Sequence, residues 1–200
     1  MSFSEGRRSP LLGPLVGKTA TFLVEGRQEN VRLAQTLAGS IAKAGLSCIV
    51  FDLDALYSSN ADLIFAELAG ATASSFTLEV PAPGSNIEAE FASLFGCQQK
   101  VIVIDSMNTL YHLISMEDGR SRGRKLMFAL ASLSQFARMN DGAVVLSMYR
   151  REGFAKSGRG RSISNLSDVT ASVDVRGDEL QIRTERGSAW PDGGLSSRIP

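Results

Sequence analysis

The stretch Lys100–Leu110, KVIVIDSMNTL, decides the fold of this chain. Four β-branched apolar residues, from Val101 to Ile104, run without alternation into Asp105. An unbroken apolar run of this kind predicts a strand buried on both faces, as at the centre of a parallel α/β sheet. A carboxylate at the carboxyl end of such a strand lies where open α/β sheets bind ligands. Asp105 is therefore either a residue that holds Mg²⁺ beside a nucleotide or a cap of the next turn.

Segments upstream of this stretch form a strand–helix–strand pattern. In residues 19–25, TATFLVE, polar and apolar residues first alternate and apolar residues then follow one another, which predicts a strand. Residues 47–53, SCIVFDL, form a second apolar run. Between them, apolar residues spaced three and four apart predict a helix that ends near Ala44 and is capped by Glu29 or Asn30. A βαβ unit of this kind favours a parallel sheet with right-handed crossovers.

The rest of the chain continues the alternation of helix and strand and then changes character. The patterns predict helices over 59–68, 87–95 and 125–139, strands over 76–80 and 142–149, and a polar loop over 117–124. Residues 150–164 are basic and glycine-rich, which is typical of an irregular segment. Two alternating runs, 169–175 and 179–185, predict an antiparallel hairpin. An irregular tail follows, in which we expect Trp190 to pack.

Composition and charge limit what the chain can be. Its 200 residues fit one ordinary domain, which we place at 17–200 behind a flexible N-terminal arm at 1–16. Because 21 basic side chains balance 21 acidic ones, net charge alone predicts no polyanionic partner. Cys48 and Cys97 are too few for a zinc site or a disulfide framework, which favours a cytoplasmic location. The apolar runs are too short for a membrane span and residues 1–10 do not read as a signal peptide, so no membrane partner is expected.

A phosphate-binding loop is missing from the place where this pattern would put it. Such a loop needs glycines after the first strand, followed by Lys and then Ser or Thr. The turn Gly26–Arg32 has one glycine, no Lys, and a carboxylate, Glu29, that would repel phosphate. The stretch GPLVGKT at 13–19 is one residue short of the motif and precedes the first strand, so we interpret Lys18 as a solvated strand flank. We expect neither ATP nor Mg²⁺ as a cofactor, and no metal site unless Asp105 binds Mg²⁺.

Two further polar residues follow strands. Asp54 ends the second apolar run, near the place where some ATPases keep the carboxylate that orients the attacking water. Without a phosphate cradle, a turn-forming role for Asp54 is favoured. His112 is the only histidine and has no Ser or Cys nucleophile at a telling spacing, so packing or capping is favoured over catalysis. The candidates for catalysis therefore reduce to Asp105 and a vestigial base at Asp54.

The order of these parts resembles the RecA/RadA/KaiC superfamily of ATPase cores. The shared features are a strand and turn at 20–30, strands ending at Asp54 and Asp105, and two basic loops separated by a helix and a strand. The resemblance covers about residues 15–190. It implies a three-layer α/β fold of the RecA-like, P-loop NTPase type, with a mostly parallel central sheet and an antiparallel C-terminal hairpin. Residues 147–149, SMY, stand where the superfamily keeps a polar sensor of γ-phosphate, so hydrolysis is not carried over.

In that superfamily the two loops face single-stranded DNA, and here both loops are rich in cations. The predicted nucleic-acid contacts are Arg120, Arg122, Arg124 and Lys125 in the first loop and Arg150, Arg151, Lys156, Arg159 and Arg161 in the second. In a chain of zero net charge this concentration favours salt-dependent binding to phosphates, with Tyr149 and Phe154 placed to stack on bases. The alternatives are that these cations pair with acidic groups of a partner subunit or form a solvated surface.

Three functional hypotheses follow from these features. The leading one is a non-hydrolysing RecA/RadA-like paralogue that binds single-stranded DNA, a recombinase or both, in DNA repair or recombination. The second is a structural subunit of a RecA-like ring or hetero-complex of the Elongator type, without DNA binding. The third is a weak or atypical ATPase. All three predict a RecA-like partner or self-association, for which the arm offers an apolar strap made of Leu11, Leu12, Leu15 and Val16.

Overall fold

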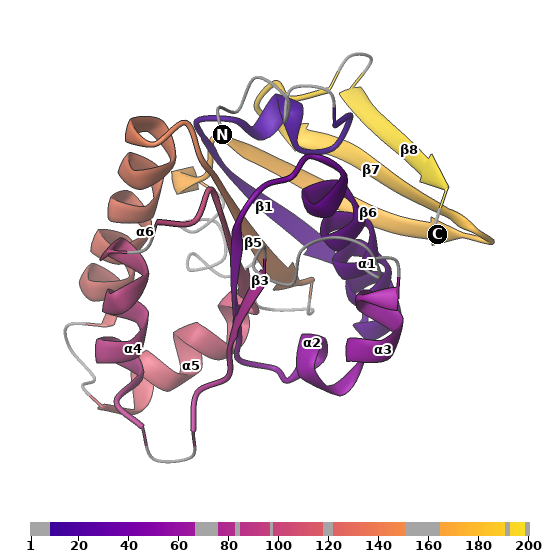
Figure 1. The fold of residues 1–200 in the computed structure, drawn as a ribbon. Coiled ribbons are helices and arrows are strands. Elements are labelled where there is room, and N and C mark those ends of the chain that lie inside the picture. The colour runs from indigo at the N-terminus through magenta and orange to yellow at the C-terminus, as the bar shows by residue number, and fades with distance from the viewer. Residues whose placement is uncertain are drawn as a thin grey trace.

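A computed structural model describes residues 9–66, 76–82, 85–96, 98–117, 122–150, 165–190 and 193–198. These residues form three layers, in which a single eight-stranded sheet lies between two groups of helices (Figure 1). The α/β class and the layered architecture predicted from the sequence are confirmed.

The sheet has the strand order β3-β2-β4-β5-β1-β6-β7-β8. Its strands are β1 (Lys18–Val24), β2 (Cys48–Asp52), β3 (Phe76–Glu79), β4 (Val101–Asp105), β5 (Ala143–Tyr149), β6 (Val169–Arg176), β7 (Glu179–Arg186) and β8 (Gly194–Arg198). All pairings from β3 to β6 are parallel, and β6, β7 and β8 are antiparallel. The mostly parallel sheet and the C-terminal hairpin are therefore as predicted.

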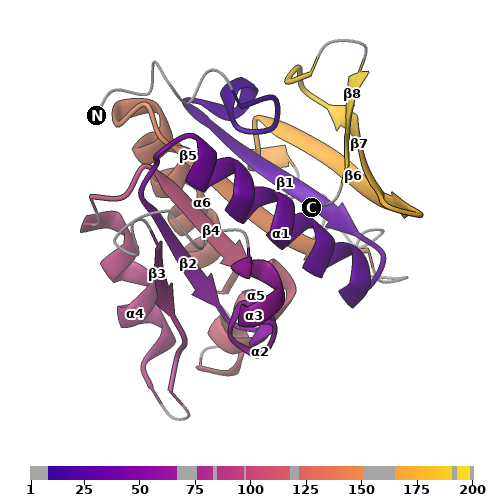
Figure 2. The ribbon, with the colours of Figure 1, turned by 45° about the vertical axis from the view of Figure 1, so that its right-hand side comes forward.

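Helices cover both faces of the sheet. They are α1 (Arg27–Lys43), α2 (Leu56–Ser59), α3 (Ala61–Ile64), α4 (Ile87–Ser93), α5 (Met107–Glu117) and α6 (Arg122–Met139), with 3₁₀ turns η2 (Gly13–Leu15) and η5 (Leu94–Gly96). One core cluster contains Leu37 of α1 and Ile64 of α3, and a second contains Leu110 of α5 and Leu130 of α6. Figure 2 shows α1 on one side of the sheet and α6 on the other.

The central strand β4 explains why its apolar run does not alternate. Val101 and Val103 belong to the core on the α1 side, whereas Ile102 and Ile104 belong to the core on the α6 side. Every residue of β4 is buried, Asp105 included. A strand covered by helices on both faces needs apolar side chains at every position, which is the pattern that the sequence shows.

The N-terminal segment corrects the prediction of a flexible arm over residues 1–16. Leu11, Leu12 and Leu15 are at most 2% exposed and lie in the core on the α1 side. Trp190 holds this segment in place, because its Nε1 donates a hydrogen bond of 3.0 Å to the carbonyl oxygen of Pro10. Residues 9–16 are thus part of the domain, and their leucines are not a strap for a neighbour. Residues 1–8 lie outside the described residues.

Several element boundaries also differ from the predicted ones. Helix α1 begins at Arg27 and not near residue 30, because Gly26 is extended and serves as its N-cap. The predicted helix over 59–68 is two short helices, α2 and α3, and the predicted polar loop over 117–124 contains the end of α5 and the start of α6. Helix α5 and strand β8 were not predicted. None of the helices in the described ranges combines the length and the mean hydropathy of a membrane span.

Candidate functional site

The carboxyl ends of β2, β4, β5 and β1 lie side by side, since these strands are neighbours in the sheet and all run parallel. Polar side chains from these ends and from the start of α1 meet there. We call them the polar cluster: Asn30, Asp54, Asp105, Ser147 and Tyr149. This edge is where open α/β sheets bind their ligands.

Asp105 lies at the centre of the polar cluster and has no exposed surface. Its Oδ1 accepts hydrogen bonds from Asn30 Nδ2, at 2.7 Å, and from Ser147 Oγ. Asn30 Nδ2 also donates to the hydroxyl oxygen of Tyr149 at 3.1 Å. Oδ2 of Asp105 is buried and lacks a hydrogen-bond partner among the described residues. The carboxyl group is therefore held inside the protein by neutral donors from α1 and β5.

Burial changes the acidity of this group. Removal from water raises the pKa of Asp105 from 3.8 to about 6, although the hydrogen bonds from Ser147 and Asn30 act in the opposite direction. The neighbouring carboxylates Asp54 and Asp52 raise the same pKa further by repulsion. Burial without a cation beside it is therefore the main reason why the pKa of Asp105 lies above its ordinary value.

Asp54 lies in the turn after β2 and not at the end of the strand, which corrects the predicted strand boundary. Its Oδ2 accepts a hydrogen bond of 2.7 Å from Ser106 Oγ, and its Oδ1 accepts one from Thr109 Oγ1. Both oxygens are therefore engaged by the segment at the start of α5. This geometry matches the turn-forming role, in which Asp54 fastens the turn after β2 to the chain that follows β4.

The strand-terminal carboxylate is Asp52, which sequence reasoning missed. Its Oδ1 accepts the backbone N–H of Leu56 at 2.8 Å and of Tyr57 at 3.2 Å, and its Oδ2 accepts that of Ser58 at 2.8 Å. These bonds satisfy the otherwise unpaired N–H groups at the start of α2. The stretch Asp52-Leu53-Asp54 contains two carboxylates that could end the strand. The signal in favour of Asp52 is that the continuous apolar run stops there.

The turn between β1 and α1 consists of Glu25 and Gly26 alone. A Cβ atom placed on Gly26 would lie 3.1 Å from Glu29 Oε2, so the Glu29 carboxylate folds back over the N-cap of α1. A carboxylate at this position takes the place where the N–H groups and dipole of a helix start would attract an anion. Arg27 is also engaged, since its guanidinium donates to Ser59 Oγ at 2.8 Å.

A cavity of about 460 Å³ lies at this edge of the sheet. The residues that line it are Glu25, Gly26, Arg27, Asp54, Asn108, Thr109, His112 and Tyr149. His112 contributes to the wall and stacks edge-on against Tyr111, with ring centroids 5.9 Å apart. Asn108 clamps the end of β5, because its Oδ1 accepts the N–H of Tyr149 at 2.7 Å and its Nδ2 donates to the carbonyl of Tyr149 at 3.3 Å.

Both oxygen atoms of the Asp105 carboxyl group are enclosed by protein. Oδ1 accepts two hydrogen bonds, and Oδ2 is buried without a partner among the described residues. Within the described ranges no group of three or more His, Cys, Asp and Glu side chains is arranged to hold a metal. The hydrogen bonds of the polar cluster connect α1 and α5 with the ends of β4 and β5.

The predicted nucleic-acid contacts fall into three groups. Arg124 and Lys125 are exposed on the first turns of α6, which begins at Arg122. Arg150, directly after β5, pairs with Glu185 and lies 3.5 Å from Glu25. The other cations lie outside the described residues, and these are Arg120, Arg151, Lys156, Arg159 and Arg161. Arg150 thus lies between two acidic side chains at the end of β5.

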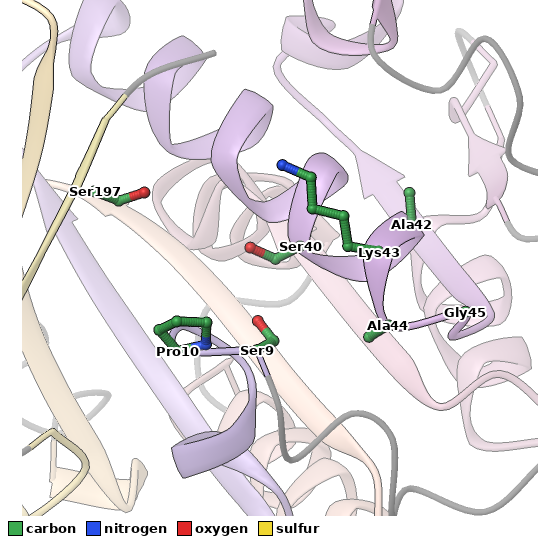
Figure 3. Close-up of a pocket in the computed structure, with 8 residues that line it drawn as sticks. All are labelled: Ser9, Pro10, Ser40, Ala42, Lys43, Ala44, Gly45 and Ser197. Atoms are coloured by element: carbon green, nitrogen blue, oxygen red, sulfur yellow. The ribbon is translucent and has the colours of Figure 1, made fainter.

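A second hollow, of about 530 Å³, lies at the opposite end of α1 (Figure 3). It is lined by Ser9, Pro10, Ser40, Ala42, Lys43, Ala44, Gly45 and Ser197. These residues come from the N-terminal segment, the end of α1 and β8. Since the polar cluster lies beside the start of α1, this hollow is separate from the candidate site.

Comparisons with known proteins address the fold. No protein-family model matches the chain, and no curated protein matches it. Among solved structures, a crystal structure of the RadB recombinase matches 100% of this chain and 96% of that chain, with a TM-score of 0.71 and 18% sequence identity. The chain therefore has a RecA-like fold. Because 589 solved chains match in this way, the fold by itself does not decide the function.

Proposed function

We propose that this chain is a RecA-fold protein of DNA recombination or repair that does not hydrolyse ATP and that binds single-stranded DNA, a recombinase or both. The burial of Asp105 is the observation that supports the absence of ATP hydrolysis. A hydrolytic site needs the carboxylate after β4 to face Mg²⁺, whereas here it faces Asn30 and Ser147. The carboxylate of Glu29 above Gly26 supports the same conclusion, since it would repel a triphosphate.

Binding of single-stranded DNA or a recombinase is supported by the similarity to the RadB recombinase structure and by the distribution of cations. Arg124 and Lys125 are exposed at the start of α6. Helix α6 packs on β1 and β5, and its last residue, Met139, comes shortly before the amino end of β5. The helix therefore begins near the carboxyl ends of these strands. Arg150 leaves β5 at the same edge of the sheet and leads into the segment that holds Arg151, Lys156, Arg159 and Arg161. Cations gathered at one edge suit a phosphate backbone.

The proposal is tested by a salt series on a labelled single-stranded oligonucleotide, followed by fluorescence anisotropy. Replacing Lys156, Arg159 and Arg161 with Ala should weaken binding and flatten the logarithmic salt slope by roughly 2, because each phosphate that is no longer neutralised lowers the slope by about 0.7. The matched control replaces Arg176, Arg183 and Arg198 of the C-terminal strands, which changes net charge equally. Identical slopes for both triple variants would remove the loop from the nucleic-acid interface.

A structural role in a RecA-like hetero-complex is the second candidate, and the pairing of Arg150 favours it. An Arg that is held by Glu25 and Glu185 fastens β5 to β1 and β7 and is less available to a phosphate. If wild-type protein binds no oligonucleotide even at low salt, while it co-purifies with a RecA-fold recombinase, this second function replaces the first.

A further inference from the structure

Helix α6 exposes large apolar side chains on its outer side. Phe128 is 73% exposed and Met139 is 75% exposed, and these are the highest values among the large apolar side chains of the described ranges. An isolated exposed apolar residue is ordinary in a soluble protein. Two of them on one side of the same helix indicate an interaction surface.

The exposed residues of α6 form a straight row. They are Arg124, Phe128, Ala131, Gln135 and Arg138. They follow one another at intervals of four, three, four and three residues, and such intervals keep side chains in line along a helix, as in the seam of a coiled coil. The row is about 21 Å long, at a rise of about 1.5 Å per residue. We call this row, together with the adjoining Met139, the α6 face.

The shape of the α6 face suits another helix. Ala131 has the smallest side chain of the face and lies one turn after Phe128. Gln135 follows one turn later, and its Nε2 lies 3.5 Å from Met139 Sδ. The face therefore has a large apolar side chain on each side of a small residue. A second helix can approach closely at the small residue and enclose the larger side chains beside it.

The charged residues of α6 are all basic. Its sequence, RGRKLMFALASLSQFARM, contains four basic residues and no acidic one. Two acidic residues lie near its C-terminal end, namely Asp141, which follows the helix, and Asp168, which pairs with Arg138 at 2.7 Å. The side chain of Arg138 nevertheless remains 63% exposed, and Arg124 is exposed at the start of the face. Charge complementarity therefore favours a binding partner that carries carboxylates.

The described part of this chain offers no matching helix. Apart from α6, only α1 and α5 are longer than seven residues there. Helix α1 contains one acidic residue, Glu29, and its apolar side packs in the core. Helix α5 also contains one acidic residue, Glu117 at its last position. This favours a different protein as the source of the complementary helix.

A nucleic acid fits the α6 face less well than a helix does. Surfaces that bind single strands combine stacked aromatic rings with a groove lined by cations. Phe128 is the one aromatic residue of the α6 face, and Arg138 is already paired with Asp168. Ala131 and Met139 offer nothing to a phosphate, whereas they suit the apolar side chains of a helix.

We propose that the α6 face binds an acidic amphipathic helix of a different protein. The apolar row of that helix covers Phe128, Ala131 and Met139, and its carboxylates lie near Arg124 and Arg138. The apolar contacts supply most of the affinity, and the exposed charges select an acidic partner. The inference goes beyond the proposed function, because the partner need be neither single-stranded DNA nor a recombinase.

The test measures the binding of labelled synthetic probes to the full-length chain by fluorescence anisotropy. The acidic peptide has 18 residues, the length of α6, with Leu at the first and fourth positions of each heptad, Glu on both sides of this row and Ala elsewhere. A second peptide carries Lys in place of Glu. A third has the composition of the acidic peptide in an order without helical periodicity. A single-stranded oligonucleotide is the fourth probe.

Two variants change the α6 face, and a third is the matched control. Phe128→Glu replaces the large apolar contact by an acid, and Arg124→Glu reverses the charge at the start of the face. The control, Leu63→Glu, makes the same kind of change at an exposed side chain of α3, which packs on the other side of the sheet. All three positions are exposed, so all three variants should keep the thermal unfolding midpoint of the wild type.

We expect the wild type and Leu63→Glu to bind the acidic peptide at least about tenfold more tightly than either other peptide. Phe128→Glu should weaken this binding by at least about tenfold, because an apolar contact is lost and two acids then face each other. Arg124→Glu should weaken binding of the acidic peptide and strengthen binding of the Lys peptide.

A wild type that does not distinguish the acidic peptide from the reordered one would overturn the proposal, as would unchanged binding by Phe128→Glu. If only the oligonucleotide binds, and Phe128→Glu weakens that binding, the α6 face belongs to nucleic acid and the proposal is overturned as well. None of these outcomes depends on Lys156, Arg159 and Arg161. The salt series that tests the proposed function can therefore succeed or fail independently.

Discussion

Replacing Asp105 with Asn should change how the stability of the protein depends on pH. The folded-state pKa of Asp105 is about 6, above the ordinary 3.8, because the group is buried. An acid with a raised pKa binds its proton more tightly in the folded state. Its stabilising contribution is therefore complete below about pH 3.8 and is lost as the pH rises through about 6.

The magnitude follows from the size of the shift. A shift of about two pH units corresponds to roughly 3 kcal/mol over the full range, of which about 2 kcal/mol falls between about pH 4.5 and pH 7. Asn keeps the shape of the side chain and the acceptor for Asn30 and Ser147, but it does not titrate. It also buries an amide N–H₂ where Oδ2 of Asp105 has no partner, at a cost of about 1–3 kcal/mol that does not depend on pH.

Urea unfolding at several pH values measures this effect directly. The free energy of unfolding of Asp105→Asn minus that of the wild type should rise by about 2 kcal/mol from about pH 4.5 to pH 7. In Ser147→Ala the free energy of unfolding should fall more steeply with pH than in the wild type. The reason is that loss of the Ser147 hydrogen bond raises the pKa of Asp105 further. If the free energies of unfolding of the wild type and Asp105→Asn depend on pH in the same way, the raised pKa of the buried Asp105 carboxyl group is refuted.

Two other predictions concern catalysis and the N-terminal segment. The purified protein should release phosphate from ATP at the background rate with or without Mg²⁺, and turnover that disappears in Asp105→Asn would contradict the proposed function. Leu12→Ala should lower the free energy of unfolding by about 2–5 kcal/mol, because Leu12 has no exposed surface. The matched change Leu63→Ala, at a side chain that is 48% exposed, should stay within about 0.5 kcal/mol in the same urea titration, and equal decreases would show that residues 9–16 do not pack as described.

The sequence predicted the centre of the fold well because burial on both faces leaves a clear pattern. The apolar run from Val101 to Ile104 consists of β-branched residues, which favour a buried strand, and the alternation around Arg176–Asp178 marks the hairpin. Asp105 was found for the same reason, since it ends that run. What the run could not show is which way the carboxylate faces, because this depends on Asn30 and Ser147, which are 75 and 42 residues away.

The misses have physical causes as well. The apolar stripe of α1 begins at Val31, so the polar first turn from Arg27 gave no periodic signal. Helix α5 has apolar residues at helical spacing. It was missed because it begins directly after β4 and runs into a polar stretch, so neither of its ends has a clear sequence signal. The burial of the N-terminal leucines was missed because their core cluster includes Trp190, which hydrogen-bonds Pro10 from 180 residues later in the chain. Contacts at that distance are fixed by the tertiary fold and leave no local pattern.

The position of β1 has a consequence for synthesis of the protein. β1 leaves the ribosome long before its two neighbours in the sheet, β5 and β6, which begin at Ala143 and Val169. Until β6 has emerged, Phe22 and its neighbours have no strand to pair with on one side. A nascent or truncated chain that stops before β6 presents an apolar strand with an open edge, which is the species that aggregates or recruits chaperones.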